Sequence, residues 1–182
     1  MSKNTALLVI DVQESFPNRP YWSETDVPAF RDRLIRLIEG ASAKGIPVVR
    51  ILHVESEGAF SLASGLVRPL DWVPPQHDVV FHKSVHNAFT DTGLDRWLRG
   101  RGITRVIVSG IRTEQCCETT TRVASDMGYE VDYVTEATLT FPMTHPTSGQ
   151  LYTSADIKAR TELVLADRFA RLRNVEEVLA DA

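Results

Sequence analysis

Three side chains that together could activate a nucleophile each follow a short apolar run of the sequence. Asp11 comes directly after residues 6–10, Lys83 follows DVVFH, and Cys116 lies shortly after RVIVS. A carboxylate can accept the proton of a thiol, and an ammonium group stabilises the negative charge on either partner. The three residues therefore predict a nucleophilic cysteine, provided that the fold brings them to one place.

The cysteines of this chain form a single adjacent pair, Cys116 and Cys117. Adjacent Cα atoms lie about 3.8 Å apart, below the roughly 4.4 Å that an unstrained disulfide needs, so we expect no bridge within the pair. With Thr113 as the cap of a helix, Cys116 falls in its first turn, where free N–H groups and the helix dipole would lower the pKa of the thiol. Cys117 points about 100° further round the helix, and we expect it to pack in the core.

The elements that must position these residues are short β-branched runs that alternate with helical periodicity. Strands are predicted over residues 6–10, 46–53, 78–81, 105–109 and 130–134. Helices are predicted over 28–44 and, more briefly, from Leu94 to Gly100. This alternation implies right-handed crossovers and a three-layer α/β/α fold around a mostly parallel, Rossmann-like sheet.

In such sheets the ligand crevice lies outside the carboxyl ends of the strands, where Asp11, Lys83 and Cys116 would meet. The least regular stretches, residues 56–75 and 140–153, are expected to form loops that shape a pocket. Aromatic residues in or near these loops could line the pocket, although aromatic side chains more often belong to the core; they are Trp22, Phe60, Trp72 and Phe141.

Length and charge limit the classes of protein to which the chain could belong. Its 182 residues, with 43% hydrophobic residues, suit one domain over residues 1–182. A net charge of -4 without a basic stripe argues against a nucleic-acid partner. No apolar run has the length of a signal segment or of the ~20-residue membrane span, so we expect a cytoplasmic protein with no membrane partner.

Three segments in order, LLVIDVQESF, FHKSVHNAF and GIRTEQCCETTTRVASDMGYEV, resemble the signature segments of the isochorismatase-like cysteine hydrolases. The patterns K-x-x-x-x-A-F and G-x-x-T-x-x-C of that superfamily match at Lys83 and Cys116, and its first-strand aspartate matches at Asp11. The resemblance, which extends from residue 6 to about 137, implies that these three form a catalytic triad. It also implies the isochorismatase-like hydrolase fold and a homo-oligomer.

The same resemblance implies a cis peptide bond between Ile111 and Arg112 that helps to shape an oxyanion hole. Candidates for the oxyanion hole or for substrate binding are Ile111, Arg112, Gln13 and Phe16. From its position, Arg112 could bind a substrate carboxylate, pair with Glu114 or lie exposed.

Metal binding is not predicted. Nicotinamidase-like members of the superfamily carry a D-x-H metal motif after the second strand, but the matching residues here are Ile51, Leu52 and His53, without the carboxylate. His82 and His86 are interpreted as surface or loop residues rather than ligands. We therefore expect neither a metal nor any other cofactor.

These observations favour a hydrolase that cleaves a C–N bond of a small amide, carbamoyl or ureido compound through a thioester on Cys116. One alternative is an isochorismatase-type hydrolase of vinyl ethers, whose chemistry does not need a cysteine at this position. Another is a binding protein in which Cys116 and Cys117 sense peroxides or thiols.

Overall fold

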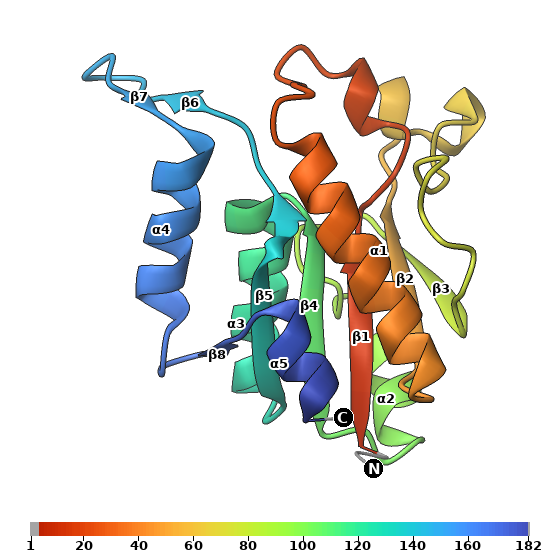
Figure 1. The fold of residues 1–182 in the computed structure, drawn as a ribbon. Helices are drawn as coiled ribbons and strands as arrows, with labels where there is room; N and C mark the ends of the chain where they lie inside the picture. Colours follow the sequence, from red (N-terminus) through yellow and green to blue (C-terminus); the bar gives the residue numbers. More distant parts are fainter. Residues whose placement is uncertain (1–3, 182) are drawn as a thin grey trace.

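A six-stranded sheet forms the centre of the computed structural model, which describes residues 4–181 (Figure 1). Its strands stand in the spatial order β3-β2-β1-β4-β5-β8, and each neighbouring pair is parallel. They span β1 Thr5–Ile10, β2 Val48–His53, β3 Val79–Lys83, β4 Arg105–Ile111, β5 Glu130–Leu139 and β8 Arg171–Leu172. The prediction of a mostly parallel α/β sheet is confirmed.

Helices cover both faces of the sheet. Helices α1 (Val27–Ala43) and α5 (Val175–Ala180) lie on one face, and α2 (Leu94–Arg99) and α3 (Glu118–Asp126) lie on the other (Figure 1). Helix α4 (Ser154–Leu165) stands beside α3, and the hairpin of β6 (Met143–Thr144) and β7 (Leu151–Tyr152) projects beyond the sheet. The three-layer arrangement therefore holds, with α4 and the hairpin added at one side.

Strand β1 is buried on both faces, which explains its continuous apolar sequence. Leu7 and Val9 belong to the core beneath α1 and α5, whereas Ala6, Leu8 and Ile10 belong to the core beneath α2 and α3. Side chains alternate between the two faces of a strand, so each layer receives every second residue. This burial holds the carboxyl end of β1, and Asp11 after it, at the centre of the sheet.

Strands β3, β4 and β5 run further than predicted, and the extensions of β3 and β4 concern the candidate site. Strand β3 includes Lys83 because Lys83 pairs with His53 at the end of β2. Strand β4 continues through Gly110, which pairs with Ile10. A Cβ atom on Gly110 would lie 2.0 Å from the carbonyl oxygen of Ile10, and its φ of +128° suits glycine alone, so this glycine marks a close approach of two strands rather than a strand end.

The chain after residue 153 contains helices and a strand that were not predicted. Helix α4 begins with a capping box formed by Thr153 and Asp156, and α5 begins with one formed by Asn174 and Glu177. Between them, β8 adds the last parallel strand to β5. The expected loop 140–153 contains the β6–β7 hairpin, and 56–75 contains two short 3-10 turns, Gly58–Phe60 and Leu62–Ser64.

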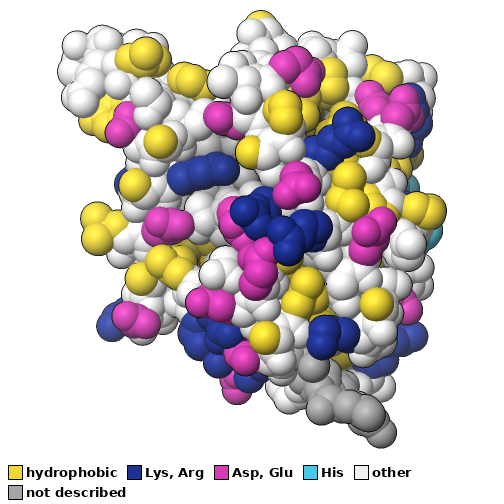
Figure 2. Space-filling model, viewed as in Figure 1, with side chains coloured by type: hydrophobic (Ala, Val, Ile, Leu, Met, Phe, Trp, Pro, Cys, Tyr) yellow, Lys and Arg dark blue, Asp and Glu magenta, His cyan; other side chains and the backbone are white. Residues whose placement is uncertain are grey.

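Basic and acidic side chains are interspersed over the face formed by α1 and α5 (Figure 2). Arg33 and Arg36 of α1, for example, pair with Glu176 of α5 at 3.1 and 2.7 Å. Within residues 4–181, none of the helices combines the length and the apolar character needed to cross a bilayer.

Candidate active site

The structure brings Asp11, Lys83 and Cys116 together at the carboxyl ends of the strands. The ammonium Nζ of Lys83 lies 2.8 Å from Oδ2 of Asp11 and 3.3 Å from Sγ of Cys116. All three side chains are buried, Asp11 being 1% and Cys116 7% exposed. The arrangement is a buried ion pair in contact with a thiol.

Asp11 owes its position to an unusual backbone conformation. Its φ is +53°, in the left-handed region that aspartate and asparagine occupy more readily than most residues. Its N–H still donates to the carbonyl of Ile51 at 2.8 Å, so the residue stays anchored to β2. Its Oδ2 forms the ion pair with Lys83 at 2.8 Å, and neither of its oxygens accepts a further hydrogen bond from the described chain. The carboxylate is therefore open to accept a proton.

Cys116 lies in a π-helical turn, Thr113–Cys117, that leads into α3. The cap of this turn is Arg112, so the prediction of Thr113 as the cap is wrong. Thr113 is fully buried, and its hydroxyl bonds to Thr138 of β5 at 2.7 Å instead. Cys117 is fully buried in the core and both cysteines are free, as predicted.

The electrostatics of the site differ from the prediction for the thiol. Burial raises the pKa of Cys116, and the negative charge of Asp11 raises it further, while Lys83 only partly opposes these effects. The predicted lowering of this pKa is therefore wrong, because desolvation and a neighbouring carboxylate outweigh the start of a helix. Burial also raises the pKa of Asp11 despite the charge of Lys83.

Lys83 behaves in the opposite way to an isolated buried amine. Burial alone would lower the pKa of the ammonium, but the charge of Asp11 and the contact with Cys116 outweigh it and raise the pKa. These shifts favour a charged ammonium on Lys83 and a neutral thiol on Cys116. A carboxylate with a raised pKa is a stronger base toward that thiol.

The peptide bond between Ile111 and Arg112 is cis, as the resemblance implies. Of the three roles considered for Arg112, the structure shows pairing with Glu114: Nη2 lies 3.0 Å from Oε1, and both side chains are largely buried. The guanidinium also lies over the ring of Tyr21, 4.8 Å from its centroid. Ile111 is fully buried beside it.

Gln13 and Phe16, the other candidates for substrate binding, make contacts within the protein. The side-chain amide of Gln13 accepts a hydrogen bond from the N–H of His53 at 2.7 Å and donates to its carbonyl at 3.0 Å. Phe16 packs edge-on against Phe60, with centroids 5.1 Å apart. Gln13 thus ties the chain after β1 to the end of β2, and a substrate contact for either residue stays a prediction.

His53 is a site residue that the sequence did not assign. Its Nδ1 lies 3.1 Å from Nζ of Lys83, and its side chain is 15% exposed. The sequence held one signal for it, since both residues end adjacent apolar runs and so face each other in a parallel register. His82 and His86 are exposed. Across residues 4–181, no three His, Cys, Asp or Glu side chains gather as a metal site would require.

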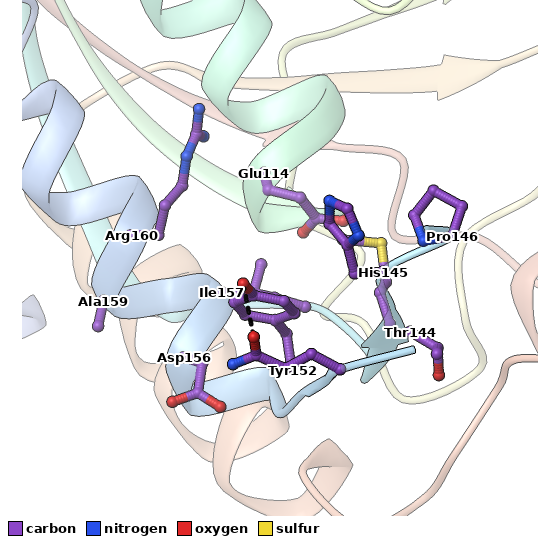
Figure 3. Close-up of a pocket in the computed structure, with 11 residues that line it drawn as sticks. Glu114, Thr144, His145, Pro146, Tyr152, Asp156, Ile157, Ala159 and Arg160 are labelled. Carbon is purple, nitrogen blue, oxygen red and sulfur yellow. Dashed lines mark hydrogen bonds between the residues drawn. The ribbon is translucent and has the colours of Figure 1, made fainter. Parts of the chain in front are cut away.

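A cavity of about 540 Å³ lies away from this centre, between the β6–β7 hairpin and α4 (Figure 3). Of the residues near Cys116, only Glu114 lines it; Asp11, Lys83 and Cys116 do not. The loop 140–153 therefore does shape a cavity, as predicted, but not one that contains the three candidate residues. Among the aromatic candidates, Trp22 packs on Phe141 and Trp72 on Phe30, so both pairs lie in packing contacts.

The sequence and the fold of this chain are similar to those of known proteins of one family. Residues 5–151 match the family model of the isochorismatase domain. An uncharacterized isochorismatase family protein of Bacillus subtilis, YrdC, is 27% identical over 191 residues, covering 100% of this chain and 97% of that protein. A streptothricin hydrolase of Streptomyces noursei is 33% identical over 135 residues, which cover 69% of this chain and 46% of that enzyme. The crystal structure of an isochorismatase from Pseudomonas putida superposes with a TM-score of 0.87 at 25% identity, covering 96% of this chain and 90% of that one.

Proposed function

Because the chain belongs to the isochorismatase family of hydrolases, we propose that it cleaves the C–N bond of a small amide, carbamoyl or ureido compound through a thioester on Cys116. The observation that carries the proposal is the thiol of Cys116 in contact with Lys83, whose ammonium lies 2.8 Å from the Asp11 carboxylate. The name of one relative, the streptothricin hydrolase, denotes hydrolysis. A nicotinamidase of Escherichia coli, 28% identical over 173 residues, supports amide chemistry by its name.

Acylation begins from a neutral thiol. The raised pKa of Cys116 disfavours a standing thiolate, so Asp11 takes the thiol proton as Sγ attacks the substrate carbonyl. Backbone N–H groups near Arg112 and Cys116 stabilise the oxygen that becomes negative. Asp11 then gives the proton to the leaving nitrogen, the C–N bond breaks, and an acyl thioester remains on Cys116.

Deacylation reuses the same carboxylate. Asp11 accepts a proton from a water molecule as that water attacks the thioester, and the proton returns to the sulfur when the C–S bond breaks. Lys83 keeps its proton throughout and stabilises whichever of its two neighbours is negative. One water molecule is consumed, and the products are an acid and an amine or ammonia.

A hydrolysis screen with a matched pair of variants tests the proposal. Purified protein is incubated with simple amides, carbamoyl amino acids, ureido acids and biuret, and released ammonia or amine is measured. We expect turnover with at least one class in the wild type and in Cys117→Ala, but not in Cys116→Ala. Acid-quenched Cys117→Ala enzyme should show the acyl adduct on Cys116 by mass spectrometry.

The alternatives give different results in this screen. Hydrolysis of a vinyl ether by Cys116→Ala, with no amide turnover in the wild type, would support the vinyl-ether reaction. Reversible oxidation of Cys116 without hydrolysis of any substrate would support a thiol sensor.

A further inference from the structure

The ammonium of Lys83 forms an ion pair with Oδ2 of Asp11 at 2.8 Å and makes three further contacts, of which only one is with the candidate nucleophile. Besides Sγ of Cys116 at 3.3 Å, it donates to the carbonyl of Val85 at 3.1 Å and to Nδ1 of His53 at 3.1 Å. We propose that His53 is a positioning residue, which holds the ammonium against the thiol by accepting this hydrogen bond in its neutral, Nε2-protonated form. The inference rests on the proposed function for its catalytic consequence, but not for its geometry.

The protonation state of His53 follows from its partner. An ammonium has no lone pair and only donates, so Nδ1 of His53 must be the acceptor and the proton must reside on Nε2. Nε2 lies 3.5 Å from Oε1 of Glu55, which favours a proton on that side. The hydrogen bond made by one ring nitrogen of a histidine commonly decides which of the two nitrogens carries the proton.

The imidazole is held in place from several directions. Its ring meets that of Phe60 edge-on, with centroids 5.7 Å apart. Its backbone N–H and carbonyl are both bonded to the side-chain amide of Gln13. Because the backbone and the ring plane of His53 are both held, its Nδ1 acceptor has a defined position. The imidazole therefore needs no reorganisation to accept the hydrogen bond from Lys83.

The ionisable groups around His53 keep the ring neutral. Burial lowers its pKa, and so do the charges of Lys83 and of His86 from the loop after β3, while Asp11 and a contact with the backbone of Val85 raise it without reversing the shift. Glu55 is half exposed on the solvent side. Since the folded pKa lies below the ordinary value, His53 stays an acceptor at neutral pH and loses that ability only in acid.

The consequence concerns the thiol proton. The contacts with Val85 and His53 hold the ammonium where it lies both 3.3 Å from Sγ of Cys116 and 2.8 Å from Oδ2 of Asp11. Asp11 can therefore exchange the proton with Sγ while Lys83 stays in place. Removal of the Nδ1 acceptor takes away one of the contacts that hold the ammonium against the thiol, so its contact with Sγ weakens while its ion pair with Asp11 remains.

Nitrogen NMR of the imidazoles tests the proposal without a substrate. Protein labelled with 15N-histidine is titrated, and the His53 signals are assigned by their loss in His53→Asn. We expect the Nε2-protonated tautomer at pH 7 and a midpoint below 6.5. The Nδ1-protonated tautomer, or a midpoint at or above 6.5, would overturn the proposal whether or not any substrate is hydrolysed.

Two variants of His53 then test the effect on the site. His53→Asn keeps an acceptor near the position of Nδ1, and His53→Leu removes it; His82→Asn, an exposed neighbour of Lys83, is the control. On a substrate from the screen, we expect kcat to fall roughly tenfold to a hundredfold in His53→Leu with little change in KM, and to recover mostly in His53→Asn. Equal losses in both variants would refute the positioning role, since a purely structural defect does not distinguish an acceptor from a methyl group.

If no substrate is found, alkylation of Cys116 by iodoacetamide at pH 9 replaces kcat. We expect it to be about tenfold slower in His53→Leu, because the ammonium no longer stabilises the thiolate, and near the wild-type rate in His53→Asn and His82→Asn. Wild-type rates in His53→Leu would contradict the proposal. Because the tautomer and alkylation need no turnover, a failed hydrolysis screen with these results intact would refute the proposed function alone.

Discussion

The substitution Gly110→Ala should destabilise the protein through a contact between two strand backbones. The added Cβ would lie 2.0 Å from the carbonyl oxygen of Ile10 and 2.7 Å from its nitrogen. Both atoms belong to the backbone and cannot rotate away, so β1 and β4 would have to separate by about 1 Å, and overpacking of this kind costs about 1–3 kcal/mol. A φ of +128° adds about 1–3 kcal/mol for a residue with a side chain.

The expected loss is therefore about 2–6 kcal/mol, a large share of the roughly 5–15 kcal/mol that stabilises a typical domain. Urea denaturation followed by tryptophan fluorescence measures it as a fall in the free energy of unfolding. Gly102→Ala is the matched control, since Gly102 has a φ of +68° with no atom within 4 Å of the added Cβ, and it should lose only about 1–2 kcal/mol. Equal losses in the two variants would refute the steric argument.

Three further predictions concern the candidate site. Cys116→Ser should reduce kcat about a thousandfold or more, whereas Cys117→Ala should keep most of it because that thiol is fully buried in the core; similar losses would contradict the assignment. Alkylation of Cys116 by iodoacetamide should be slow at neutral pH and become fast only in alkali, since burial and Asp11 raise the pKa of the thiol. Asp11→Asn should shift the pH profile of alkylation to lower pH, and Lys83→Met should shift it to higher pH. A wild-type profile like that of a free thiol would show the reasoning to be wrong. Hydrolysis should survive EDTA, because Ile51 stands where a metal-binding member has a carboxylate; loss of activity that zinc or manganese restores would overturn this.

The strands that position the site could be predicted because buried strands leave continuous apolar runs in the sequence. Continuous apolar runs indicated strands covered on both faces, and the polar residues that end them indicated where the side chains would meet. The same logic was incomplete at Gly110, which interrupts the apolar pattern although the strand continues, because its role is to admit a neighbouring backbone. The helices after residue 153 were not predicted, although both begin with readable capping boxes.

The electrostatics of the site could not be predicted from position along the chain. The sign of the pKa shift at Cys116 depends on the depth of its burial and on the proximity of Asp11, 105 residues earlier in the sequence. The contact of His53 with Lys83 depends likewise on the register of β2 against β3. The start of a helix is a local signal and makes only one contribution to the pKa of Cys116. Burial and the charge of Asp11, which depend on the tertiary fold, contribute more.

The two hydrogen bonds between the side chain of Gln13 and the backbone of His53 continue the pairing of β1 with the last residue of β2 beyond the end of β1, with a side chain in place of a backbone. A backbone ladder opens cooperatively with its sheet, whereas a single side chain can release its partners on its own. Amide hydrogen exchange at His53 should therefore report the opening of this one contact, while exchange in Leu7 to Ile10 reports global unfolding. Faster exchange at His53 than in Leu7 to Ile10 would show that this side-chain link opens independently of the sheet beneath it.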